Sequence, residues 1–243
     1  MIPTNEMPAM VAKTMTGGAQ CAIAGGYTSN HNTTRPASQP RETPKQWAQR
    51  YASTVPASMA VVPVKFGTKK PTVLGDDWQD KAPRGGDVQA VSWLWRKTGH
   101  NIGLLVGPDH VVLDEDELAY LRRFGVEPGK LRTPTAQSQS GSFHFWFKHP
   151  GVDLPASIGA RYDADGNRIP RTGADVLTGN KQVLVQPSIV QRADGSIGRY
   201  QWLDGLSIFD VEPAELPAAL LTALLALMQP RCDHKPAQPR PDG

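Results

Sequence analysis

Four consecutive acidic residues follow an apolar run at residues 111–113, and carboxylates in such a position can bind a cation. If the run is a buried strand, its side chains alternate between two faces, so Asp114 and Asp116 lie on one face. Glu115 and Glu117 then lie on the other. Two adjacent carboxylates repel each other unless a cation neutralises them, and oxygen ligands at this spacing suit Mg²⁺ or Mn²⁺. The alternative is a solvated strand end that leads into an acidic first helical turn.

A second segment whose residue types could take part in chemistry is the aromatic run at residues 143–148, in which phenylalanine alternates with other side chains. Phe143, Phe145 and Phe147 share one face, which we expect to be the core. The other face carries a hydroxyl, an imidazole, an indole and an ammonium group, from Ser142, His144, Trp146 and Lys148. The Ser- and Gly-rich loop before the strand can bring backbone N–H groups close to a phosphate. The alternative is a half-exposed strand whose histidine only contacts water.

Charge and cysteine usage limit the partners and the compartment. The formal net charge is +3, with 26 Lys and Arg against 23 Asp and Glu, so nucleic-acid binding would depend on a local patch. Two basic clusters are available, and each could equally be a solvated loop; they are Lys65, Lys69 and Lys70, and Arg161, Arg168 and Arg171. Cys21 and Cys232 have no Cys or His neighbours at zinc-ligand spacing, so we expect no zinc and a reduced, cytoplasmic protein. No run of apolar residues is long enough for a membrane span.

The pattern of apolar and turn residues predicts an α+β chain around a largely antiparallel sheet. Residues 1–42 and 229–243 have the composition of a disordered leader and tail, which leaves one domain at residues 43–228. Helices are predicted to begin at Thr43-Pro44 and at Asp87, and a short one to cover residues 118–124. Strands are predicted at residues 59–66, 102–106, 111–116, 143–148 and 183–186, with a turn at residues 107–109 joining the second to the third.

The last predicted helix, in residues 212–228, is apolar over more than one face. Leu216, Leu220, Leu224 and Leu227 form one stripe at helical spacing, and Leu221, Leu225 and Met228 form a second beside it. Such a helix is too short to cross a membrane and too apolar to remain in water. It must therefore dock on its own core, our first expectation, or on a partner.

The order of these motifs resembles the bifunctional primase-polymerase domain of the archaeo-eukaryotic primases. The resemblance rests on an Asp-x-Asp at a strand end, a Ser-x-His strand after a Gly/Ser loop, and an Asp-Val followed by a strand ending in Pro-Ser, which are here residues 114–116, 142–144, 175–176 and 187–188. The flanks agree, with an apolar strand followed by Lys70-Pro71, then Trp78, an aromatic helix, and Asn101-Ile102-Gly103. Each motif is short, but their common order is fairly specific.

The resemblance implies an archaeo-eukaryotic primase core, an RRM-like sheet flanked by helices with a smaller N-terminal α/β part. It implies that Asp114, Asp116 and Asp175 bind two Mg²⁺ or Mn²⁺ ions. It implies that the triphosphate is contacted by Ser142, His144 and Ser188. Position 177, often Arg in that family, is Leu, so Lys148 and Lys181 are candidates for the missing phosphate contact. Expected partners are nucleoside triphosphates, a single-stranded DNA template held by the basic clusters, and a separate helicase.

Other functions remain open at this point. The chain could be a gap-filling polymerase or a plasmid or phage replication protein on the same fold. It could also be a catalytically silent nucleic-acid-binding module, although the presence of all three aspartates argues against this. A metal-dependent nuclease is the third alternative, since acidic clusters with a histidine also hydrolyse phosphodiesters. The preference for ribo- or deoxynucleotides, and the ability to start a chain, are left unassigned.

Overall fold

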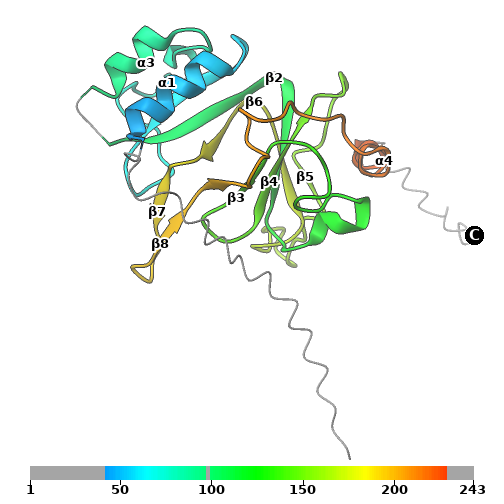
Figure 1. Ribbon diagram of the computed structural model, residues 1–243. Coiled ribbons are helices and arrows are strands. Elements are labelled where there is room, and N and C mark those ends of the chain that lie inside the picture. The colour runs from blue at the N-terminus through cyan, green and yellow to red at the C-terminus, as the bar shows by residue number, and fades with distance from the viewer. Residues whose placement is uncertain (1–41, 97–98, 229–243) are drawn as a thin grey trace, which may run out of the picture. The chain divides into compact units, whose positions relative to one another are not determined.

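One long strand, β2 (Asn101–Glu115), runs through the middle of the structure (Figure 1). The computed structural model describes residues 42–96 and 99–228. The predicted leader, apart from Glu42, and the predicted tail lie outside the described residues. Within the described part, the chain is α+β with a largely antiparallel sheet flanked by helices, as the sequence predicts.

The main sheet has seven strands, and β2 pairs with three of them. Along the sheet the order is β5 (Ser157–Ile158), β6 (Ala174–Val185), β2, β4 (Phe143–Lys148), β3 (Thr135–Gln137) and β9 (Gln201–Trp202), while β1 (Ala60–Val64) pairs with the first half of β2. All of these pairings are antiparallel. A separate hairpin consists of β7 (Ile189–Gln191) and β8 (Ile197–Arg199).

The two strands predicted at residues 102–106 and 111–116 are a single strand, so the predicted turn at residues 107–109 is wrong. The β6 strand continues opposite both halves, and β2 advances from Gly107 to Val111 while β6 moves only from Gly179 to Thr178. The Gly-Pro-Asp segment is therefore a bulge, which takes up extra residues without ending the strand. Gly107 has φ 76°, and a Cβ there would lie 2.7 Å from the carbonyl oxygen of Ser58.

Two helices begin where local chemistry predicts. Thr43 and Gln46 form a capping box at α1 (Pro44–Thr54), and the Asp87 carboxylate accepts from Ala90 N at 2.9 Å to cap α3 (Val88–Leu94). The predicted helix at residues 118–124 is a shorter 3₁₀ helix, η1 (Tyr120–Phe124), which ends at Gly125 with φ 78°. The remaining helices are α2 (Trp78–Lys81) and α4 (Ala218–Met228). None of the helices in the described ranges is long and apolar enough to span a membrane.

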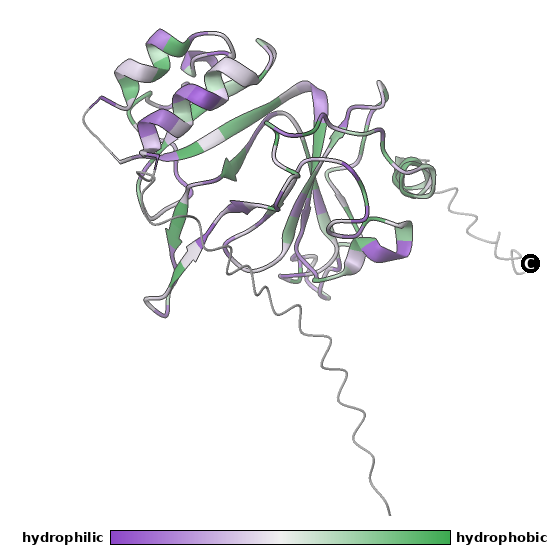
Figure 2. Ribbon diagram, viewed as in Figure 1, coloured by the Kyte–Doolittle hydropathy of each residue, from purple (hydrophilic) through white to green (hydrophobic). Residues whose placement is uncertain are grey.

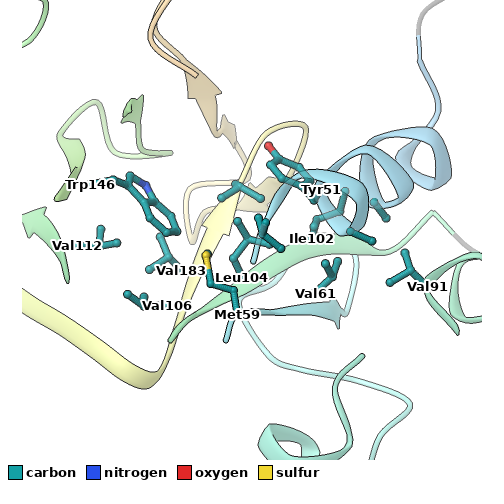
Figure 3. Packing of buried hydrophobic residues seen from close by; sticks show 14 of the residues in the cluster. Tyr51, Met59, Val61, Val91, Ile102, Leu104, Val106, Val112, Trp146 and Val183 are labelled. Atoms are coloured by element: carbon teal, nitrogen blue, oxygen red, sulfur yellow. The ribbon is translucent and has the colours of Figure 1, made fainter. Parts of the chain in front are cut away.

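Both faces of the sheet are covered. On one face, α1 and α3 lie over the sheet, and the cluster between them includes Tyr51, Ile102, Leu104, Val112 and Trp146 (Figure 3). On the other face, Val111, Leu113, Phe145 and Phe147 pack against residues of η1 and α4. The alternation predicted for residues 143–148 is thus present, but the face of His144 and Trp146 is buried as well, at 4 % and 0 % exposure. Trp202 and Tyr200, which follow β8, cover it.

The apolar α4 docks on the core of its own chain. Leu216, Leu220 and Leu224 are buried in the second cluster, whereas Leu227 is 52 % exposed and does not continue the predicted stripe. Leu225 and Met228, of the second predicted stripe, are also partly exposed. The apolar residues of α4, which are green in Figure 2, therefore lie both on its buried side and on its outward side.

We expect Leu220→Ala to lower the free energy of unfolding by about 2–5 kcal/mol, because it opens a cavity under α4. The matched control Leu227→Ala removes the same atoms from an exposed position, and should change stability by no more than about 0.5 kcal/mol. Urea unfolding of both variants measures the difference. Equal losses in the two would contradict this docking of α4.

Candidate active site

Strand pairing places three of the predicted site residues side by side. Asp114, near the end of β2, is the register partner of His144 on β4 and of Asp175 on β6. Directly paired side chains of antiparallel strands are immediate neighbours on one face. The His144 imidazole Nε2 lies 3.1 Å from Asp114 Oδ1. The histidine and two of the three aspartates thus come together from segments far apart in the sequence.

The third aspartate is linked to the others through Arg168, which precedes β6. The guanidinium donates to Asp116 Oδ2 at 2.9 Å and to Asp175 Oδ1, and it also donates to the Thr172 carbonyl at 3.3 Å. A planar guanidinium can bridge two carboxylates in this way. Arg168, predicted as a template contact, is instead turned into the aspartate group.

The aspartates repel one another. Burial raises the pKa of Asp116, and the nearby charges of Asp114 and Asp175 raise it further, against the opposing effect of Arg168. Burial also acts to raise the pKa of Asp114, but the adjacent His144 outweighs it, so this pKa lies below its ordinary value. Positive charge close to these carboxylates is therefore stabilising.

A pocket of about 540 Å³ opens beside Asp114 and His144. Two ammonium groups, from Lys69 and Lys181, border it, and Trp78 and Tyr200 supply aromatic surface. The His144 and Tyr200 ring centroids are 5.6 Å apart, and His144 Nδ1 is buried without a protein partner among the described residues. The pocket combines an acidic edge with cationic and aromatic walls, which suits a ligand with both phosphates and a ring.

Three predicted nucleotide contacts lie elsewhere. Ser142 is buried, and its hydroxyl is within 2.9 Å of Ser138 Oγ and 3.1 Å of Ser140 Oγ. Lys148 is at the other end of β4, 3.1 Å from Glu215. Ser188 is 1 % exposed; its hydroxyl accepts from Ile102 N at 2.8 Å and donates to Ile102 O at 3.0 Å. Cross-strand register and loop packing, which motif order does not fix, separate these residues from the pocket.

The residues predicted to bind the template also lie in different places. Lys65 and Lys70 are exposed on the loop after β1, and Lys69 of the same loop enters the pocket lining. Arg171 lines a different depression, with Ser140 and Arg192.

Sequence reasoning missed the pocket positions of Tyr200 and Trp78. A tryptophan in the predicted position of the family motif was a signal for Trp78, but no motif marked Tyr200.

The three carboxylates fit a hard divalent cation by donor type, and the Arg168 guanidinium stands between two of them as a cation does. Within residues 42–96 and 99–228, however, no three Asp, Glu, His or Cys side chains already converge as a metal site. Metal binding by these aspartates would therefore require Arg168 to turn away.

Carboxylates, a histidine and lysines around one pocket on an α+β sheet define a candidate site for phosphoryl or nucleotidyl chemistry. The chain matches the model of the family described as "Bifunctional DNA primase/polymerase, N-terminal" over residues 30–219, and it belongs to that family. Membership supports a DNA primase or polymerase activity in general. A comparison with curated proteins found no match.

The bridge made by Arg168 leads to a prediction about stability in the absence of divalent ions. With a chelator present, Arg168→Met should lower the free energy of unfolding by about 1–3 kcal/mol, because Asp116 and Asp175 lose their partner. Adding Asp116→Asn to this variant should recover part of the loss, because it removes repulsion. Arg161→Met is the control, since Arg161 is more exposed and lies 3.9 Å from Glu117. Thermal unfolding of the four proteins makes the comparison, and an Arg168→Met variant as stable as the control would contradict the bridge.

Proposed function

We propose that this protein is a template-dependent nucleotidyl transferase, a DNA primase or polymerase that uses two divalent metal ions in a plasmid or phage replication system. The observation that carries the proposal is the placement of Asp114 between His144 and Asp175, at the edge of a pocket bordered by two lysines. Family membership supports the general activity. We expect the enzyme to work in the cytoplasm with a separate helicase.

In this proposal the aspartates hold the metal ions. Asp114, Asp116 and Asp175 supply oxygen ligands, and Arg168 leaves them when the ions bind. Two bound Mg²⁺ or Mn²⁺ ions would activate the primer 3′-hydroxyl and stabilise the charge on the triphosphate. Arg168 then neutralises the carboxylates only when no ion is present, which accounts for its position between two of them.

The pocket receives the nucleoside triphosphate. Lys69 and Lys181 lie on its border and neutralise phosphate charge, so Lys181 supplies the contact for which Lys148 is too distant. Asp114 orients the His144 imidazole through Nε2, and the imidazole borders the pocket where the phosphates would bind. Trp78 and Tyr200 offer flat surface to the base or sugar.

The direct test is incubation with primed or unprimed single-stranded DNA, Mg²⁺ or Mn²⁺, and either ribo- or deoxynucleoside triphosphates. Extension of a primer, or new strands without one, supports the proposal and shows which activity is present. Shortening of the DNA would favour a nuclease instead. Binding without any reaction would favour a silent nucleic-acid-binding module.

Each of the changes Asp114→Ala, Asp116→Ala and Asp175→Ala should abolish synthesis while the protein still folds, and Asp116→Ala should also relieve repulsion, because neighbouring carboxylates raise the pKa of Asp116. Weaker Mn²⁺ binding in titration calorimetry should accompany the loss. Asp153→Asn, at an exposed position in the loop after β4, is the control and should keep both properties. Near-normal synthesis by the Asp175 variant, with the Asp114 variant inactive, would show that the third ligand is misplaced.

A second prediction separates nucleotide binding from template binding. His144→Ala should raise the nucleotide KM by about tenfold or more, because a contact with a charged phosphate is lost, and should leave template affinity nearly unchanged. Steady-state extension assays and fluorescence anisotropy give the two quantities. His149→Ala, in the loop beyond β4, is the matched control. An unchanged nucleotide KM in the His144 variant would contradict the role.

A further inference from the structure

The loop after β1 carries an aromatic side chain that the proposed chemistry does not use. Phe66 is 61 % exposed, although a phenylalanine normally loses most of its surface on folding. Three lysines share its loop, Lys65, Lys69 and Lys70, and all are exposed. The ion pairs found among the described residues involve none of these lysines. An exposed ring among uncompensated cations is complementary to a polyanion that has flat apolar groups.

The loop is held in place at several points. Lys65 N donates to the Lys70 carbonyl at 2.9 Å, which closes the loop. Gly67 forms a bridge with Val190, and Gln191 N donates to the Gly67 carbonyl at 2.9 Å, so the loop is tied to the β7–β8 hairpin. That hairpin projects from the body of the molecule (Figure 1).

A buried side chain completes the attachment. Asn101 Nδ2 donates to Thr68 O at 3.0 Å and to Ile189 O at 2.6 Å, and Asn101 Oδ1 accepts from Ile189 N at 3.0 Å. One side chain at the start of β2 thus fixes both the loop and the hairpin. The ring of Phe66 is therefore presented by an ordered backbone, which lowers the entropy lost when a ligand binds.

The loop also adjoins the candidate active site. Lys69 lines the same pocket as Asp114 and His144, and its carbonyl accepts from Gln182 Nε2 at 3.3 Å. Phe66, Lys65 and Lys70 belong to the same short loop as this pocket residue. A chain bound along the loop would therefore lie next to the pocket.

We propose that Phe66 stacks on a base of single-stranded nucleic acid, while Lys65 and Lys70 contact its phosphates. Stacking of bases on aromatic side chains next to cations is how proteins hold single strands without reading their sequence. An apolar protein partner fits less well, because three exposed lysines share the loop of Phe66. The inference rests on the proposed function for its role in synthesis, but strand binding can be measured without synthesis.

The test uses fluorescence anisotropy of a labelled oligothymidylate of about a dozen nucleotides. Phe66→Ala should weaken binding by about 5- to 150-fold, the usual effect of removing one stacked base contact. Phe66→Trp should retain binding, and Phe66→Leu should resemble the alanine variant. Trp93→Ala is the matched control, since Trp93 is also 61 % exposed but lies on α3 and does not line the pocket. It should bind like the unchanged protein.

Salt dependence separates the ring from the lysines. Lys65→Ala and Lys70→Ala should each reduce the slope of log affinity against log salt by about 0.7, because one phosphate contact is lost. Phe66→Ala should leave the slope unchanged, because the ring carries no charge. A change of slope in the Phe66 variant, equal to that in the lysine variants, would contradict stacking.

The proposal is overturned if Phe66→Ala binds the oligonucleotide normally, or if Trp93→Ala weakens binding equally. It is also overturned if Phe66→Leu binds as well as Phe66→Trp, because the contact would then be merely apolar. Thermal unfolding of each variant excludes a general loss of structure. If the protein binds the strand through Phe66 but never synthesises DNA, the proposed function fails and this inference stands.

Discussion

The candidate site depends on one constraint: the end of β2 is paired with a strand on each side, β4 and β6. Backbone hydrogen bonds to β4 and β6 fix Asp114 opposite His144 and Asp175. Such ladders resist the repulsion between neighbouring carboxylates, because separating the acids would require breaking a strand in the middle of the sheet. The same strand is buried on both faces through Val111, Val112 and Leu113. The acids are thus held together by the free energy of a core that lies next to them.

The negative charge of the three aspartates must be compensated, and the protein compensates part of it with the guanidinium of Arg168. Arg168 bridges Asp116 and Asp175, and His144 Nε2 lies 3.1 Å from Asp114 Oδ1. This arrangement lowers the cost of keeping several carboxylates in a partly buried place. In the proposed enzyme the same carboxylates would exchange Arg168 for metal ions, so the guanidinium would be a stand-in for the ions and not a permanent part of the site.

The lysines around the pocket come from other parts of the fold than Arg168 does. Lys69 is on the loop after β1 and Lys181 is on β6, and Asn101 and Gln182 attach the Lys69 loop to the main sheet. Cationic groups are thereby placed in the same pocket lining as Asp114, and the charge of Lys69 helps to lower the pKa of that carboxyl. In the proposed enzyme, a triphosphate bound in this pocket would have its anionic groups near the lysines. The modest net charge of +3 is no obstacle, because the field at a site is local.

Sequence alone determined the class of fold, because alternation and turn residues follow from local geometry. The order of the motifs, through its resemblance to the family, singled out the aspartates that the register brings together. The sequence also located the starts of α1 and α3 from their N-capping residues. Only the tertiary structure decided which polar residues meet the pocket. Ser188 shares a motif with the site but bonds to Ile102, while Tyr200 shares none and contacts His144. Proximity between distant segments is set by strand pairing and loop packing, and these depend on the whole core.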